Sequence, residues 1–151
     1  MREIRPETVI FIRNNKNEIL LVEKPHLHYG EIYIPLGDLV KDSESTFENV
    51  RRNCLTTGLE IADTKLKGLV TEVSKDIQWH LFIYLIEDFK GETTKDVEGH
   101  KLQWISIVKL DEIALPQADK VYAPIILSSP DFYEAKYTFD DDMKLVKTES
   151  I

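Results

Sequence analysis

Cysteine is almost absent from this chain, and long apolar runs are missing altogether. The single cysteine, Cys54, cannot form a disulfide within the chain, which agrees with a reducing compartment. No stretch approaches the roughly 20 apolar residues that a membrane-spanning helix needs. Residues 1–7 lack the apolar run of a signal peptide. We therefore expect a cytoplasmic protein that makes no membrane contact.

Basic residues are in deficit. The chain carries 19 lysines and arginines against 27 aspartates and glutamates, which gives a formal net charge of −8. An acidic domain repels nucleic-acid backbones unless a local basic patch is present, and the sequence contains no such cluster. We therefore expect no nucleic-acid partner.

Internal repeats and low-complexity linkers are also missing, so we predict a single domain over residues 1–151. Apolar, β-branched stretches predict strands, and residues 8–12 and 19–22 are predicted to form a hairpin around an asparagine-rich turn. Further strands are predicted at 65–73, 77–86, 102–108, 132–139 and 143–147. Helices are predicted at 46–57 and 118–127. This irregular alternation indicates an α/β or α+β fold with a mixed sheet.

The helix predicted at 46–57 has clear end signals. Ser45 is a candidate N-cap, and Glu48 stands at the spacing of a capping box. Gly58 would end the helix. Apolar residues at helical spacing predict its buried face. They are Phe47, Val50 and Cys54.

The spacing of Gly37, Arg51 and Gly58-Leu59 resembles the box of the Nudix (MutT-like) hydrolases. That box reads Gly, five residues, Glu, seven residues, Arg-Glu, an aliphatic, any residue, Glu-Glu, any residue, Gly and an aliphatic. Pro35-Leu36-Gly37 is similar to the family's Pro-Gly-Gly entry, and a tryptophan-containing strand at Trp104 follows, as in the family. The resemblance implies a Nudix-like α/β/α sandwich with a loop-helix-loop at 37–59.

The box is degenerate where the family binds metal. Ser43 stands in place of the first glutamate, and the helical glutamates are replaced by Arg52, Leu55 and Thr56. In the family these carboxylates share one helix face and hold divalent cations, usually Mg²⁺, against the substrate diphosphate. Arg52 would repel such a cation where a carboxylate would attract it. A single charge–charge contact at ~4 Å contributes roughly 4 kcal/mol at an effective dielectric near 20. We therefore predict no metal site on this face.

The resemblance leaves three functions open. The first is a module that binds a nucleotide or nucleoside diphosphate derivative, a small-molecule ligand, with little or no hydrolysis. The second is a weak or altered pyrophosphohydrolase of the nucleotide-sanitising type, and only this one would need Mg²⁺ as a cofactor. The third is a non-catalytic scaffold for protein contacts. A homodimer is compatible with each of them.

Candidate site residues follow from the same comparison. Displaced acids that would serve a remaining catalytic activity are Glu44, Glu48 and Glu98. Expected ligand-binding residues are Lys24, Tyr33, Arg51, Arg52 and Asp119. Arg52 has two interpretations, because its guanidinium either binds phosphate in place of Mg²⁺ or pairs with Glu48 on the helix surface. Asp119 opens the second helix as a dipole-matched acid, or reads a base edge as in the oxidised-purine branch of the family.

Overall fold

The computed structural model describes residues 1–151 and contains two β-sheets and two α-helices. The helices are α1 (Thr46–Leu55) and α2 (Gln117–Ser128), and a 3-10 helix, η1 (Ile107–Glu112), precedes α2. The strands are β1 (Glu3–Ile12), β2 (Glu18–His26), β3 (Gly30–Ile34), β4 (Glu60–Val73), β5 (Ile77–Lys90), β6 (Asp96–Val97), β7 (His100–Ser106), β8 (Tyr133–Phe139) and β9 (Leu145–Ser150).

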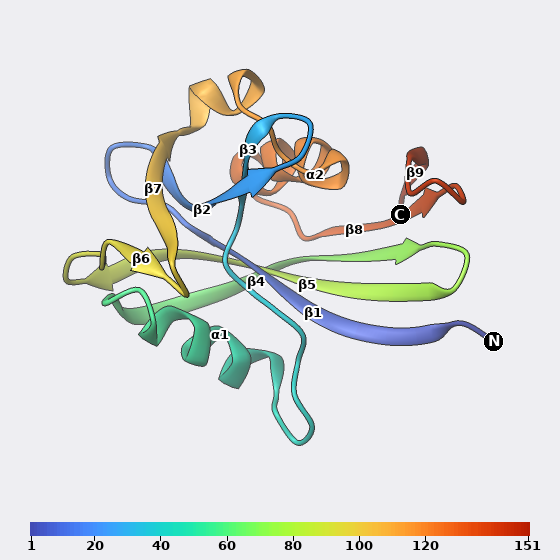
Figure 1. The fold of residues 1–151 in the computed structure, drawn as a ribbon. Helices are drawn as coiled ribbons and strands as arrows, with labels where there is room; N and C mark the ends of the chain where they lie inside the picture. Colours follow the sequence, from blue (N-terminus) through green and yellow to red (C-terminus); the bar gives the residue numbers. More distant parts are fainter.

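A five-stranded mixed sheet with the order β1-β5-β4-β8-β9 forms the middle layer. The pairs β1–β5 and β4–β8 are parallel, and β4–β5 and β8–β9 are antiparallel. Helices α1 and α2 lie on opposite faces of this sheet (Figure 1). A separate buried apolar cluster lies on each face, the larger one under α2. The predicted mixed sheet between helices and the loop-helix-loop at 37–59 are therefore confirmed.

Strand β2 connects the two halves of the core. It lies in a four-stranded antiparallel sheet of order β3-β2-β7-β6. Ile19 and Leu21 belong to the cluster on the α2 face, whereas Leu20 and Val22 belong to the cluster on the α1 face. Because successive strand residues point to opposite sides, a strand at the junction of both clusters has to be apolar at every position.

The predicted hairpin between β1 and β2 is wrong. β1 pairs with β5 in parallel along its whole length, and β2 pairs with β3 and β7. The two strands meet only at the bridge between Arg13 and Ile19. The turn between them is real, with the Asn14 side chain accepting from Lys16 N and Glu18 N. A turn signal reverses the chain, but it does not decide which strand becomes the hydrogen-bonding partner.

Helix α1 begins as predicted. Ser45 and Glu48 form both bonds of the capping box. Val50 and Cys54 are buried as expected, but Phe47 is 46% exposed, so its predicted burial is wrong. Phe47 lies in the first turn, and its ring is covered only by the Arg51 guanidinium, 5.9 Å from the ring centre.

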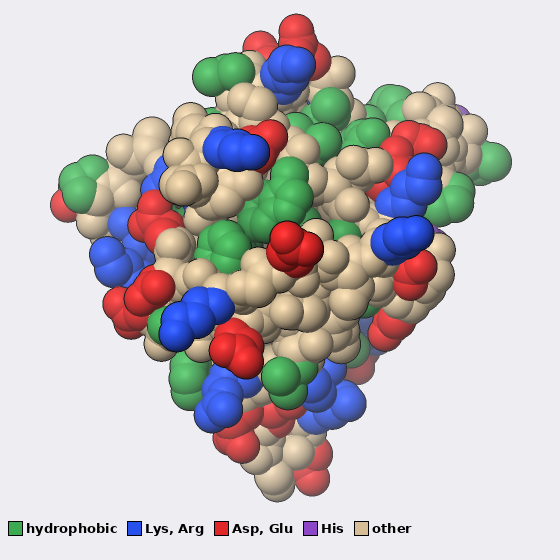
Figure 2. All heavy atoms as spheres, turned by 90° about the vertical axis from the view of Figure 1, so that its left-hand side faces the viewer, with side chains coloured by type: hydrophobic (Ala, Val, Ile, Leu, Met, Phe, Trp, Pro, Cys, Tyr) green, Lys and Arg blue, Asp and Glu red, His purple; other side chains and the backbone are tan.

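Several element bounds differ from prediction where a distant strand supplies the hydrogen bonds. β3 and β6 form where no strand was predicted from the sequence. α1 ends at Leu55, two residues early. None of the helices combines the length and apolar character that crossing a membrane would take. On the face drawn in Figure 2, acidic and basic side chains are interspersed around a small apolar centre.

Candidate functional site

The loop that enters the α1 segment is held against the free edge of β1. Thr8 N donates to Asp38 O at 3.0 Å, and Ile10 N donates to Leu36 O at 2.8 Å. Gly37 lies between these bonds with φ +125°, and a Cβ there would sit 2.1 Å from Thr8 O. Only glycine fits such a contact in this backbone conformation. The loop is therefore a fixed wall of the site.

An arginine-centred ion cluster occupies the polar face of α1. Arg52 Nη1 and Nη2 donate to the two carboxylate oxygens of Asp38 at 3.0 and 2.9 Å. Arg52 Nε donates to Glu44 at 2.8 Å. Hydrogen bonds from Arg52 lower the pKa of Glu44 to about 2. The bonds that Arg52 donates to Glu44 and to Asp38 raise the pKa of Arg52 itself. Burial acts to raise the pKa of Asp38, but hydrogen bonds from Arg52 and the neighbouring asparagines outweigh it and lower that pKa.

Two asparagines on the same helix face complete the cluster. Asn49 is fully buried, and its Nδ2 donates to Asp38 at 2.9 Å and to Glu44 at 3.2 Å. Its Oδ1 accepts from the Thr8 hydroxyl at 2.5 Å and from Asn53 at 2.9 Å. This network joins β1, the Gly37 loop and α1, and it holds these three segments together.

This arrangement decides between pairings that the sequence left open. Arg52 pairs with Asp38 and Glu44, so the predicted pairing with Glu48 is wrong. Glu48 is engaged in the capping box instead. Leu55 is 76% exposed on the helix. Mg²⁺ requires several oxygen ligands, and a face built around a guanidinium and a leucine does not fit it.

A small groove of about 140 Å³ lies beside this cluster. Lys24 of β2, Asp38, Asn53 of α1 and Glu98 line it, together with His100. The predicted residues Lys24 and Glu98 therefore lie close to the loop, on the side of α1.

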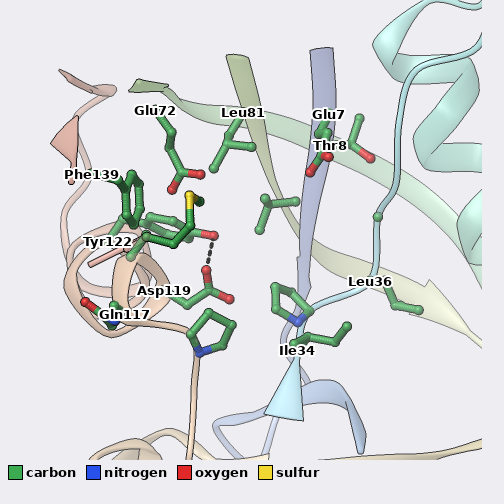
Figure 3. A pocket seen from close by; sticks show the side chains of 16 residues that line it. Glu7, Thr8, Ile34, Leu36, Glu72, Leu81, Gln117, Asp119, Tyr122 and Phe139 are labelled. Carbon is green, nitrogen blue, oxygen red and sulfur yellow. Dashed lines mark hydrogen bonds between the residues drawn. The ribbon is translucent and has the colours of Figure 1, made fainter. Parts of the chain in front are cut away.

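A larger cavity of about 340 Å³ lies on the other side of the same loop. Its floor is the sheet at Glu7, Glu72 and Leu81, and its far wall is the start of α2 with Asp119 (Figure 3). The β8–β9 hairpin closes one side with Phe139 and Met143. The segment 34–37 lines both hollows. The two hollows therefore share this segment as a common wall.

Two carboxyl groups point into this cavity (Figure 3). Asp119 is 8% exposed, and one of its oxygens accepts from the Tyr122 hydroxyl at 2.5 Å. Burial raises the pKa of Asp119 to about 6, although the Tyr122 bond acts against this. Burial, with Asp119 and Glu7 nearby, raises the pKa of Glu72 to about 8. Burial also raises the pKa of Glu7.

Two other candidate ligand residues lie outside both hollows. The Tyr33 hydroxyl donates to Glu23 at 3.0 Å on the four-stranded sheet. Arg51 is exposed beside Phe47 on the outer side of α1. The structure thus brings Asp119 into the cavity and Lys24 and Glu98 into the groove, and it places Tyr33 and Arg51 elsewhere.

Sequence reasoning missed Glu72, Glu7, Asp38 and Asn49. Asn49 and Asn53 carried a usable signal, because asparagine is unfavourable inside a helix unless its side chain has a specific partner. No comparable sequence signal marks Glu72, because a charged residue near a strand end is ordinarily solvent-exposed. Only the packing of α2 over β4 encloses it.

Comparison with known proteins decides the relationship. The family model described as NUDIX domain matches residues 3–128. The chain belongs to the NUDIX family. Among solved structures, the MutT protein of Bacillus halodurans superposes with a TM-score of 0.85 at 22% identity, covering 97% of both chains. The ORF135 protein of E. coli gives a TM-score of 0.68 at 18% identity over 85% of this chain and 95% of that one. The MutT NUDIX hydrolase of Burkholderia pseudomallei gives 0.65 at 21% identity over 85% and 99%.

These identities establish the shared fold. Helix α1 lies where the resemblance places the helix of the box, and the two glycines that bound this segment both have steric reasons to be glycine. A Cβ at Gly58 would lie 2.8 Å from Glu92 O, as one at Gly37 would clash with Thr8 O. In this member of the NUDIX family the helix geometry is retained, while the side chains at the box's acidic positions are Arg52, Leu55 and Thr56.

Proposed function

We propose that this NUDIX protein binds a nucleotide or nucleoside diphosphate derivative and hydrolyses it little or not at all. The observation that carries the proposal is the pair of hollows on either side of residues 34–37, next to a helix face where Arg52 is held by two carboxylates. The cavity has room for a heterocycle, and the groove has room for phosphate groups.

The cavity supports a base site. Asp119 presents a carboxyl oxygen to the cavity while the Tyr122 hydroxyl fixes the other one. A carboxyl held this way can accept hydrogen bonds from ring N–H or amino groups. Apolar side chains such as Leu81 and Phe139 surround it and would contact a ring. Cavities with apolar walls and a few fixed polar groups are typical of small-molecule sites.

Lys24 is the group best placed to contact phosphate. It lines the groove and takes part in no hydrogen bond or ion pair within the protein, whereas every nitrogen of the Arg52 guanidinium already donates to Asp38 or Glu44. A phosphate would have to displace two carboxylates to reach Arg52. We therefore assign phosphate binding to Lys24 and a structural role to Arg52.

The expectation of little or no hydrolysis rests on the side chains that α1 presents on this face. Metal-assisted hydrolysis needs a cation that polarises phosphate and lowers the pKa of water. The positions that hold this cation in the family carry a guanidinium, an exposed leucine and a threonine in this chain.

Binding and turnover are tested together. A panel of nucleoside diphosphates is screened by thermal shift and calorimetry, in EDTA and in Mg²⁺, and product release is followed by chromatography. We expect a stabilising ligand in EDTA, weaker binding at higher salt, and loss of affinity in Lys24→Gln and Asp119→Asn, but not in the control Lys16→Gln. Robust Mg²⁺-dependent release of a nucleoside monophosphate, abolished by a change in the groove, would contradict the proposal. The absence of any shift across the panel would favour a protein-interaction scaffold.

A weak hydrolase is the second candidate, and one observation favours it. Asp38 and Glu98 line the groove together, so a displaced acid does face the place assigned to phosphate. Glu44 and Glu48 are already bonded to Arg52 and to Ser45, which leaves Glu98 as the free acid. If this candidate is correct, slow turnover will disappear in Glu98→Gln and persist in Glu48→Gln.

A further inference from the structure

The larger cavity is acidic and contains no basic side chain. Glu7, Glu72 and Asp119 line it, and none of its 16 lining residues is lysine, arginine or histidine. The charge of Arg5 acts on Glu7, but Arg5 is itself paired with Glu3 at 2.9 Å. Glu72 and Asp119 therefore face the same space with no basic side chain in its lining.

Hydrogen bonding leaves these groups open to a ligand. Asp119 is more than nine-tenths buried, and only one of its oxygens has a protein donor, the Tyr122 hydroxyl. The other oxygen points into the cavity (Figure 3). The Glu72 carboxyl points into the same space and receives no hydrogen bond from the protein. Asp119 is buried and Glu72 is partly buried. A carboxylate withdrawn from water without a donor or a counter-charge is costly, so a ligand that supplies either is favoured there.

Aromatic rings border the same space. Tyr122 and Phe139 lie beside Glu72 in the cavity wall (Figure 3). Ring faces attract cations, and the attraction grows when the cation is desolvated. The carboxyls and the rings thus favour the same ligand property.

We propose that Glu72 and Asp119 make the cavity selective for a heterocycle that carries a positive charge, such as a purine alkylated on a ring nitrogen. This inference rests on the proposed nucleotide site and specifies the chemical class of the base. Glu72 is the specificity-determining residue, because it adds a second carboxyl where Asp119 alone would accept from a neutral base.

Proton release on binding distinguishes a cationic ring from a neutral one. Burial raises the pKa of Glu72 to about 8, so at neutral and mildly acidic pH the free protein holds a proton on this carboxyl. A cationic ring favours the carboxylate form and should expel a proton on binding. A neutral ring leaves the proton in place.

The test compares 7-methylguanosine diphosphate with guanosine diphosphate by calorimetry in EDTA at pH 6, where the methylated ring keeps its N1 proton and its positive charge. The two probes share the same donor edge and phosphates and differ in one methyl group and its positive charge. We expect the methylated probe to bind at least about tenfold more tightly, and its binding enthalpy to depend on the ionisation enthalpy of the buffer. Glu72→Gln should reduce the preference to about twofold or less. The control Glu60→Gln, an exposed carboxyl on the same strand, should leave it unchanged.

The outcomes separate the two proposals. Equal affinity for both probes, or a preference that survives in folded Glu72→Gln, overturns the charge selectivity and leaves the nucleotide site standing. Binding of neither probe by the folded protein overturns both. Thermal melting of each variant establishes that it is folded.

Discussion

Arg52 is the residue at the centre of the ion cluster on α1. Its guanidinium connects Asp38 and Glu44 to the helix. A guanidinium offers five donors in a planar fork, which suits two carboxylates approaching from different parts of a loop. These bonds occupy all three nitrogens of the guanidinium.

Replacement of this arginine should destabilise the protein in a pH-dependent way. Arg52→Gln leaves Asp38 and Glu44 facing each other, and we expect the Tm at pH 7 to fall by roughly 2–5 °C. The pKa of Glu44 is lowered from 4.5 to about 2, so its contribution is present above pH 4.5 and is lost as the pH falls toward 2. The difference from wild type should shrink over that range. The neighbouring Arg51→Gln, on the exposed side of α1, is the control and should have little effect.

Glu72 should give the protein the opposite pH dependence. Its pKa is raised from 4.5 to about 8, and the ionisable groups facing it are Glu7, Asp119, Tyr122 and Tyr137. The folded state therefore keeps a proton that the unfolded state releases, and stability should fall as the pH rises from 4.5 to 8.

Glu72→Gln removes this ionisation. We expect the variant to be more stable than wild type at pH 9, on the order of 2 kcal/mol, and about equal to it at pH 4.5. Urea unfolding at both pH values measures the difference. A wild-type protein whose unfolding free energy does not decrease over this range would show that Glu72 is solvated.

At the scale of elements, the Gly37 loop separates cavity from groove and depends on contact with β1. Gly37→Ala introduces a Cβ at 2.1 Å from a backbone oxygen in a positive-φ conformation, so the loop has to leave β1. We expect a loss of about 3 kcal/mol or more and weaker nucleotide binding. Gly99→Ala is the matched control, because its φ is also positive but nothing lies within 4 Å of its Cβ. Its cost should be about 1 kcal/mol. Equal costs for the two would mean that conformation, and not the contact with β1, holds the loop.

At the scale of the whole molecule, the cavity exists only because four separate parts meet. The main sheet supplies the floor, the Gly37 loop and α2 supply two walls, and the β8–β9 hairpin closes the remaining side. The hairpin is attached to α2 by Leu145 N donating to Gln117 Oε1 at 2.9 Å. The C-terminal hairpin and α2 are therefore linked in the wall of the cavity.

Opening this side should weaken binding without unfolding the protein. Phe139→Ala removes a wall of the cavity, whereas the adjacent core residue Tyr137 stays in place. We expect about tenfold weaker binding of a nucleoside diphosphate by calorimetry. Phe132→Ala, at an exposed phenylalanine outside the cavity, is the control. Similar losses in both variants would place the base elsewhere.

Local features of this protein follow from neighbouring residues. The capping box of Ser45 and Glu48, the turn at Asn14 and the loop-helix-loop between Gly37 and Leu59 each depend on contacts within a few residues. Such contacts form in any context that lets the segment adopt its preferred backbone, so composition and spacing predict them. The resemblance to the Nudix family added the expectation of an α/β/α sandwich around a mixed sheet.

Long-range pairing decided the rest. β1 joins β5 instead of β2, and Arg52 finds Asp38, 14 residues away, instead of Glu48 one turn away. Glu72 enters a cavity beside Asp119 because α2 packs over β4 and β5. These outcomes depend on which apolar faces cover one another across the whole core, and burial is a property of the assembled layers. The sequence specifies the chemical type of each residue. Its neighbours, and therefore its charge state and role, are determined only when distant segments pack together.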